Sequence, residues 1–127
     1  MNYGFVKVAT AAPEVRVADV TFNTQKTIAA MHTAAEHGAR LVVFPELGLT
    51  AYTCSDLFFQ SALIQKAKDA VQQIAGETET LDILAVVGLP LAVGDKLYNA
   101  AAFLQGGRIL GFATKKYLPN YSEFYEM

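Results

Sequence analysis

The sequence predicts an α/β fold in which short strands alternate with amphipathic helices around a partly parallel sheet. Apolar runs of strand length are separated by two longer stretches whose apolar residues recur at helical spacing, and Gly or Pro punctuates the boundaries. This alternation is typical of parallel strands joined by right-handed crossovers. Helices on one side leave the other face of the sheet bare, so we expect a further layer against it.

Composition points to a single domain, residues 1–127, that buries surface beyond its own core. The chain has 127 residues, of which 53% are hydrophobic and 17% charged. An ordinary soluble domain has about 45–50% apolar and about 25% charged residues. We therefore expect a partner subunit or a further segment of chain to cover part of this surface.

Charge and cysteine content exclude several classes of protein. The net charge is −2 and the basic residues are scattered, which argues against a nucleic-acid partner. Uncharged runs fall short of the roughly 18–20 residues of a membrane span, and no secretory signal is present, so no membrane partner is expected. The lone cysteine, Cys54, allows no internal disulfide, and a cytoplasmic location follows as the default. Two isolated histidines and one cysteine predict no metal site.

The first half of the chain predicts a strand, a helix and a second strand. A short buried strand is expected over residues 5–9, ended by Pro13. The spacing predicts a helix over 17–37, capped by Asp19 or Asn23 and stopped by Gly38. The continuous apolar run 41–44 is typical of a strand covered on both faces. The predicted inner face of the helix consists of Val20, Ile28, Met31, Ala34 and Ala35.

The second half predicts a helix, a strand and a hairpin. After a loop over 46–56, a helix is expected over 61–75, and a buried strand over 83–88 followed by Pro90. Strands over 97–104 and 108–113 form a hairpin, because Gly106-Gly107 is a two-residue turn signal. The second helix is expected to point Leu63, Ala67, Ala70, Val71 and Ile74 inward and Lys66, Lys68 and Asp69 outward.

Glu46 follows a buried strand directly, in the segment Phe44-Pro45-Glu46-Leu47. In open α/β sheets, ligands bind beyond the carboxyl ends of the strands. A partly desolvated glutamate at that edge is suited to general base catalysis. A glutamate in this position is more often a turn residue or an ion-pair partner, and composition alone does not separate the two.

The segment 115–126 concentrates aromatic residues, lysines and glutamates where the last strand of the hairpin ends. Aromatic walls with a few oriented charges are what a pocket for a small polar ligand requires. A solvated, tyrosine-rich connecting loop has the same composition, so this alternative stays open at this point.

Together the two segments resemble the nitrilase superfamily of carbon–nitrogen hydrolases. Residues 44–52, followed by Asp56-Leu57-Phe58, and residues 116–121, running into 123–126, closely resemble the glutaminase domains of glutamine-dependent NAD synthetases. The resemblance implies an α-β-β-α sandwich, of which this chain is the N-terminal half. It also implies a Glu–Lys–Cys triad in which Glu46 and Lys115 are catalytic, with Tyr52, Tyr121 and Glu123 around the substrate.

The resemblance implies amide hydrolysis, in which Glu46 moves protons, Lys115 meets the oxyanion and a cysteine attacks the carbonyl. The family's nucleophile follows its lysine in the sequence. Cys54 precedes Lys115, so it does not fit this role. We therefore expect the chain to end before the catalytic cysteine and to be inactive by itself.

The function that the resemblance implies is a glutamine amidohydrolase that supplies ammonia to an ATP-dependent synthetase module of the same full-length chain. ATP and Mg²⁺ would belong to that module, with no cofactor in this segment, and a homo-oligomer is expected. A stand-alone amidase is one alternative. A non-catalytic α/β module is another, although residues 10–13 lack the glycine-rich phosphate loop that a nucleotide-binding member of that class carries.

Overall fold

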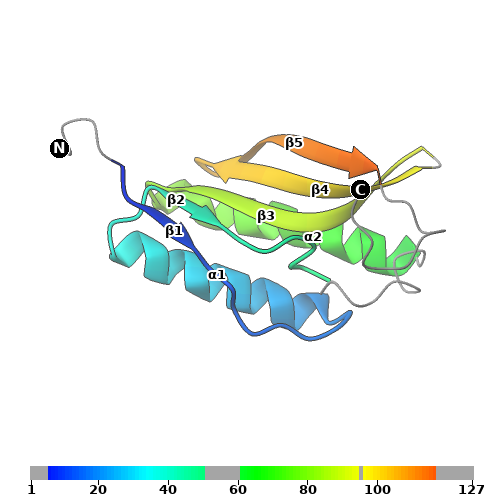
Figure 1. Ribbon diagram of the computed structural model, residues 1–127, viewed down its shortest axis with the longest axis horizontal. Coiled ribbons are helices and arrows are strands. Elements are labelled where there is room, and N and C mark those ends of the chain that lie inside the picture. Colours follow the sequence, from blue (N-terminus) through cyan, green and yellow to red (C-terminus); the bar gives the residue numbers. More distant parts are fainter. Residues whose placement is uncertain (1–5, 51–60, 95, 117–127) are drawn as a thin grey trace.

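A computed structural model describes residues 6–50, 61–94 and 96–116 of the chain. These residues form a mixed five-stranded sheet with two long helices, so the α/β fold predicted from the sequence is confirmed (Figure 1). The elements in chain order are β1 (Val8–Thr10), α1 (Val20–Glu36), β2 (Leu41–Val43), α2 (Ser61–Glu77), a 3-10 turn η2 (Thr78–Thr80), β3 (Leu84–Val93), β4 (Lys96–Gln105) and β5 (Arg108–Lys116).

The strands lie side by side in their order along the chain. The first three are parallel, β4 is antiparallel to β3, and β5 is antiparallel to β4. Strand β5 therefore runs in the same direction as β2 and β3. The carboxyl ends of these three strands share one edge of the sheet, where an α/β fold places ligands.

Both helices cover the same face of the sheet, as the sequence predicts. The crossovers from β1 to β2 and from β2 to β3 step in the same direction, and right-handed connections that do so put their helices on one side. Helix α2 packs on β3, β4 and β5, and α1 lies beside α2 (Figure 1). Neither helix is long and apolar enough to cross a membrane, nor is any other helix of the described residues.

The core lies between the sheet and the two helices. Three alternate residues of β3 and three of β4 are buried there, whereas their neighbours face the opposite side. All five residues predicted to point inward from the second helix are buried, and the three predicted to point outward are exposed. The strand residues of this layer are Ala85, Val87, Leu89, Ala100, Ala102 and Leu104.

Helix α1 begins and ends at the signals found in the sequence. The Asp19 carboxylate accepts a hydrogen bond from the Phe22 backbone nitrogen at 3.0 Å, so Asp19 is the N-cap. Gly38 ends the helix at φ +85°, a left-handed conformation that favours glycine. Three polar residues that the apolar pattern does not predict are also buried: Asn23, Thr24 and Thr27.

The hairpin is confirmed, with both of its strands longer than predicted. Gly106 and Gly107 both adopt positive φ, as a tight turn between twisted strands requires. The predicted end of β3 at Gly88 is wrong, because the strand passes through Pro90 to Val93. The carbonyl of Gly88 faces away from β4 and accepts from Leu49, so the nitrogen of Pro90, two residues on, faces the same side and no ladder bond to β4 is lost.

The face of the sheet opposite the helices is open in the described residues. Val6 and Val8 are 63% and 59% exposed, so the prediction of a buried first strand is wrong. Val43 of β2 is 38% exposed, which corrects the prediction that both faces of this strand are covered. The reason is the same in each case: the described residues supply a helical layer to one face only.

Candidate active site

Glu46 lies in a compact turn that connects the end of β2 to the edge of β3. The Phe44 nitrogen donates to the Val86 carbonyl at 2.9 Å, which continues the parallel ladder past β2. The chain then turns, with Leu47 at φ 53°, and returns so that the Leu49 nitrogen donates to the Gly88 carbonyl at 3.2 Å. Glu46 is therefore held between two backbone contacts to the same strand.

Gly88 allows this turn to lie directly on β3. A Cβ atom at this position would lie 2.5 Å from the Leu47 nitrogen and 2.7 Å from the Pro45 carbonyl oxygen. Those separations are shorter than van der Waals contact, and both atoms belong to the backbone. Any side chain at position 88 would push the turn, and Glu46 with it, away from the sheet. The sequence analysis did not single out Gly88.

A buried amide holds the far end of the same turn. Asn23 of α1 is fully buried and donates to the Leu49 carbonyl at 3.0 Å and to the Arg16 carbonyl at 2.8 Å. Its oxygen accepts from the Arg16 nitrogen at 2.7 Å. The helical layer thus fixes the turn that carries Glu46. The available signal in the sequence is the position of Asn23, three residues after Val20, at the helical spacing of the predicted inner face.

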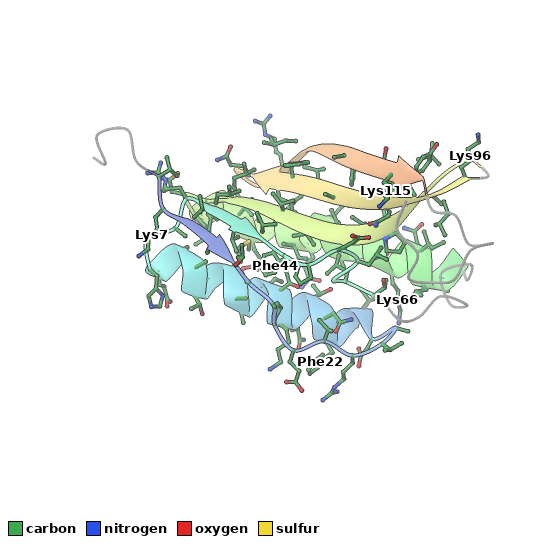
Figure 2. The ribbon with its side chains drawn as sticks, in the orientation of Figure 1. Lys7, Phe22, Phe44, Lys66, Lys96 and Lys115 are labelled. Carbon is green, nitrogen blue, oxygen red and sulfur yellow. The ribbon has the colours of Figure 1, made fainter. Side chains whose placement is uncertain are left out.

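Lys115 stands near the carboxyl end of β5 (Figure 2). The strand register places it directly opposite Asn99 of β4. The Asn99 side-chain nitrogen, Nδ2, in turn donates a hydrogen bond to Oε2 of Glu46. Three polar side chains from different parts of the sequence are thereby brought together at one edge of the sheet.

These side chains line a cleft of about 350 Å³. The cleft lies on the open face, because most of its strand residues, among them Val43, Val86 and Asn99, face away from the helices. Both residues predicted to be catalytic, Glu46 and Lys115, line it, and both are exposed. The expected partial desolvation of Glu46 is thus wrong for the described residues, since no layer covers this face. The remaining lining residues are Val43, Phe44, Pro45, Val86, Gly88, Asn99, Ala100, Ala101, Ala113 and Thr114.

The predicted substrate residues Tyr52, Tyr121 and Glu123 lie outside the described residues, as does Cys54. Their roles remain predictions. Within residues 6–50, 61–94 and 96–116, no group of three or more His, Cys, Asp or Glu gathers in a way that could hold a metal ion.

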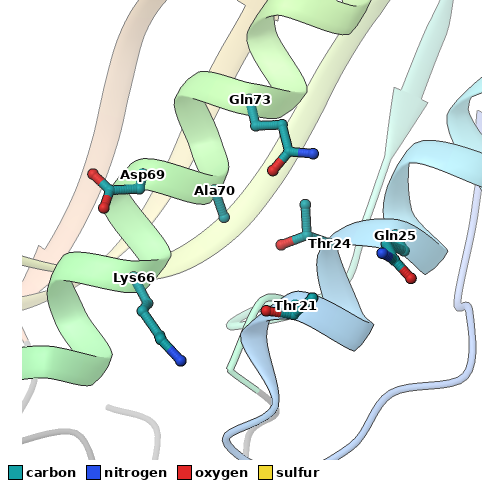
Figure 3. Close-up of a pocket in the computed structure, with 7 residues that line it drawn as sticks. All are labelled: Thr21, Thr24, Gln25, Lys66, Asp69, Ala70 and Gln73. Atoms are coloured by element: carbon teal, nitrogen blue, oxygen red, sulfur yellow. The ribbon is translucent and has the colours of Figure 1, made fainter.

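A second hollow, of about 210 Å³, lies between α1 and α2 on the helical side (Figure 3). Thr24 contributes a buried hydroxyl that has no hydrogen-bond partner among the described residues. The Asp69 carboxylate at its rim accepts from Gln65 at 2.9 Å. The hollow contains none of the predicted site residues and is lined by Thr21, Thr24, Gln25, Lys66, Asp69, Ala70 and Gln73.

A carboxylate, an amide and a lysine around one cleft at the carboxyl ends of strands provide a proton acceptor beside a cation, which is a combination suited to a hydrolase. The chain belongs to the carbon–nitrogen hydrolase family, whose family model matches residues 7–126. The fold and the matched family therefore agree on the class of protein.

Among relatives, the chain is similar to glutamine-dependent NAD synthetases. It is 36% identical over 125 residues to the enzyme named so from Mycobacterium tuberculosis, a match that covers 98% of this chain. The solved structure of the Cytophaga hutchinsonii enzyme matches with a TM-score of 0.82 at 26% identity over 89% of this chain. The structure of the Acinetobacter baumannii enzyme, solved with ADP, matches with a TM-score of 0.81 at 34% identity over 92% of this chain.

The chain spans about a fifth of the length of these relatives. The match covers 18% of the Mycobacterium tuberculosis protein and 19% and 22% of the two solved chains. The similarity therefore concerns this domain region and leaves the greater part of each relative unmatched.

Proposed function

We propose that this chain belongs to a glutaminase domain that hydrolyses the side-chain amide of glutamine and supplies ammonia to a synthetase. The observation that carries the proposal is the meeting of Glu46 and Lys115 in one cleft on the open face of the sheet. Two charged side chains distant in sequence are thereby available to the same small substrate.

Glu46 acts as the proton carrier in this proposal. It accepts the proton of the attacking thiol, delivers it to the departing ammonia and then activates the water that cleaves the thioester. Its turn is anchored at three points, the Val86 and Gly88 carbonyls and the Asn23 amide, so the backbone that carries this side chain has a defined position. Such a fixed position is what proton transfer within hydrogen-bond reach requires.

Lys115 provides the positive charge that meets the oxyanion of the tetrahedral intermediate. A cysteine from the rest of the protein acts as the nucleophile, and the lysine cation also favours its thiolate. The open face of the sheet leaves room for the segment that brings this cysteine. Tyr52, Tyr121 and Glu123 are proposed to surround the glutamine.

The proposed acceptor of the ammonia is the synthetase part of a glutamine-dependent NAD synthetase, which amidates the deaminated dinucleotide at the expense of ATP. Similarity to enzymes of that name over nearly the whole chain supports this choice. ATP and Mg²⁺ are assigned to the other part of the protein, since residues 10–13 carry no glycine-rich phosphate loop.

The test is Glu46→Gln in the full-length protein, with NAD formation measured once with glutamine and once with added ammonia. We expect glutamine-driven formation to be lost, because a neutral amide cannot accept the proton. Ammonia-driven formation is expected to persist, since the synthetase would not need this cleft. Glu36→Gln, an exposed glutamate at the end of α1, is the matched control.

The three outcomes separate the alternatives. Loss of both activities in Glu46→Gln would make Glu46 a structural residue. Retention of both would remove it from the chemistry. Full-length protein that hydrolyses glutamine but forms no NAD under either condition would indicate a stand-alone amidase.

A further inference from the structure

Asn99 occupies the position between the two proposed catalytic residues. It lies on β4, where the register pairs it with Lys115 of β5, so the two side chains project from adjacent points of the same face. Its Nδ2 donates to Glu46 Oε2 across a gap of 53 positions in the sequence.

We infer that Asn99 is a positioning residue, which fixes the Glu46 carboxylate relative to Lys115 for the proposed glutaminase reaction. The inference rests on the proposed function, because it assigns Asn99 a role only through Glu46. Asn99 transfers no proton. By holding Oε2, it leaves Oε1 as the oxygen that exchanges the proton with the reacting groups.

The chemistry of the amide fits this role better than other polar side chains. A carboxylate only accepts hydrogen bonds, so the group that faces it must donate, and the NH₂ of asparagine donates without adding charge. An aspartate of the same shape would set two carboxylates against each other. A lysine or arginine would place a second cation beside Lys115 and compete for the same carboxylate.

The difference between the exposed Glu46 and the half-buried Asn99 shows why positioning is needed. Glu46 is exposed and extends from a turn, so contacts to its backbone alone leave the side-chain torsions unrestricted. Asn99 is half-buried in the middle of a sheet, with Pro90 opposite it on β3 and Lys115 opposite it on β5. A rigid strand thus restrains an exposed side chain, and a misplacement of about 1 Å at a reacting group costs on the order of 100-fold in rate.

The experiment uses three variants of the full-length protein. Asn99→Leu keeps the side-chain volume and removes the hydrogen-bond donor. Asn99→Asp keeps the side-chain shape and replaces the donor with an accepting carboxylate oxygen. For Asn99→Leu we expect kcat of the glutamine-driven reaction to fall about 10- to 100-fold, with KM for glutamine within about twofold. Asn99→Asp should fall further. Asn99→Gln retains the donor and should keep more activity than Asn99→Leu.

Ammonia-driven NAD formation and the melting temperature show whether the fold is intact, and both should match the unmodified protein in all three variants. Gln105→Leu removes an exposed amide from the far end of the same strand and should leave every rate unchanged. This control separates loss of the Glu46 contact from a general effect on β4.

Unchanged kcat in Asn99→Leu overturns the inference. So does a joint fall of kcat, ammonia-driven activity and melting temperature in both Asn99→Leu and Asn99→Gln, because it would make Asn99 a structural residue. Glu46→Gln, assayed in parallel, keeps the two proposals apart. If it abolishes glutamine-driven turnover while Asn99→Leu leaves kcat unchanged, only the role of Asn99 fails. If Glu46→Gln also retains turnover, the proposed function itself fails.

Discussion

The two faces of the sheet differ in whether a helical layer covers them and in the kinds of side chain that they present. On the helical face, alternate residues of β3 and β4 are small or aliphatic and fully buried against α2. On the open face, the same strands present Asn99 and Gly88, and the neighbouring strands present Lys115 and the exposed Val43. One face is closed and apolar, and the other contains the cleft and its charges. Stability and the proposed chemistry therefore reside on opposite sides of one sheet.

The largest expected effect is on the open face. Lys115→Met in the full-length protein keeps most of the side-chain length but removes the cation. We expect glutamine-driven turnover to fall about 100- to 1,000-fold, the range for loss of an oxyanion-stabilising group. Ammonia-driven NAD formation and the melting temperature should not change. Lys68→Met, an exposed lysine on α2, is the control. An equal loss of ammonia-driven turnover would contradict the assignment.

The helical face is expected to respond in the opposite way. Ile74 of α2 is fully buried, and Ile74→Ala leaves a cavity that costs about 2–5 kcal/mol of stability. The melting temperature of the full-length protein should therefore fall, while kcat with glutamine stays near its original value below the transition. Lys68→Ala, on the exposed side of the same helix, should change the free energy of unfolding by less than about 0.5 kcal/mol. An Ile74→Ala protein that loses kcat without a fall in melting temperature would contradict the assignment of stability and chemistry to different faces.

Sequence patterns predicted the helical face well, because burial there follows local periodicity. The inward residues of α2, the cap at Asp19 and the hairpin at Gly106-Gly107 each depend on residues close in sequence. The open face could be predicted only in part. A sequence motif indicated Glu46 and Lys115, but Asn99 contacts Glu46 across 53 positions, and such a contact depends on strand register that no local pattern specifies.

The three missed residues share a physical reason. Gly88, Asn23 and Asn99 each act through the backbone or side chain of the turn that carries Glu46. A glycine in a strand and a polar residue in a helix look like weak points of those elements when read locally. Their contribution is evident only in the fold, where the turn that carries Glu46 packs against them. The buried strand predicted at residues 5–9 failed for the converse reason, since apolar residues indicate burial without saying which layer supplies it.

A substitution at Gly88 tests both faces at once. The residue belongs to the core strand β3, and any side chain at this position would point toward the cleft. Gly88→Ala puts a Cβ atom 2.5 Å from the Leu47 nitrogen, so the turn must shift. We expect glutamine-driven kcat to fall about 10-fold or more, with a modest loss of melting temperature. Gly76→Ala is a matched control, since a Cβ there meets nothing within 4 Å. Unchanged kcat in Gly88→Ala would show that the turn tolerates displacement.

The smallest effect is expected at Asp19, which caps the helical layer next to the segment that touches the Glu46 turn. Asp19→Ala removes the hydrogen bond to the Phe22 nitrogen, and loss of such a cap costs about 1 kcal/mol. Asp19→Asn keeps an accepting oxygen and should restore most of that loss, since the exposed contact to Arg16 at 4.0 Å contributes little.

The same variants test whether the start of α1 is coupled to the cleft. The backbone nitrogen of the neighbouring Ala18 donates to the Thr50 carbonyl at 2.8 Å, so a displaced helix start would also displace the end of the turn. Asn23 holds the same turn independently through Leu49, and we therefore expect glutamine-driven kcat to change by less than about twofold. A tenfold fall in kcat for Asp19→Ala, reversed in Asp19→Asn, would show that the capped helix and the cleft are coupled more strongly than two separate faces allow.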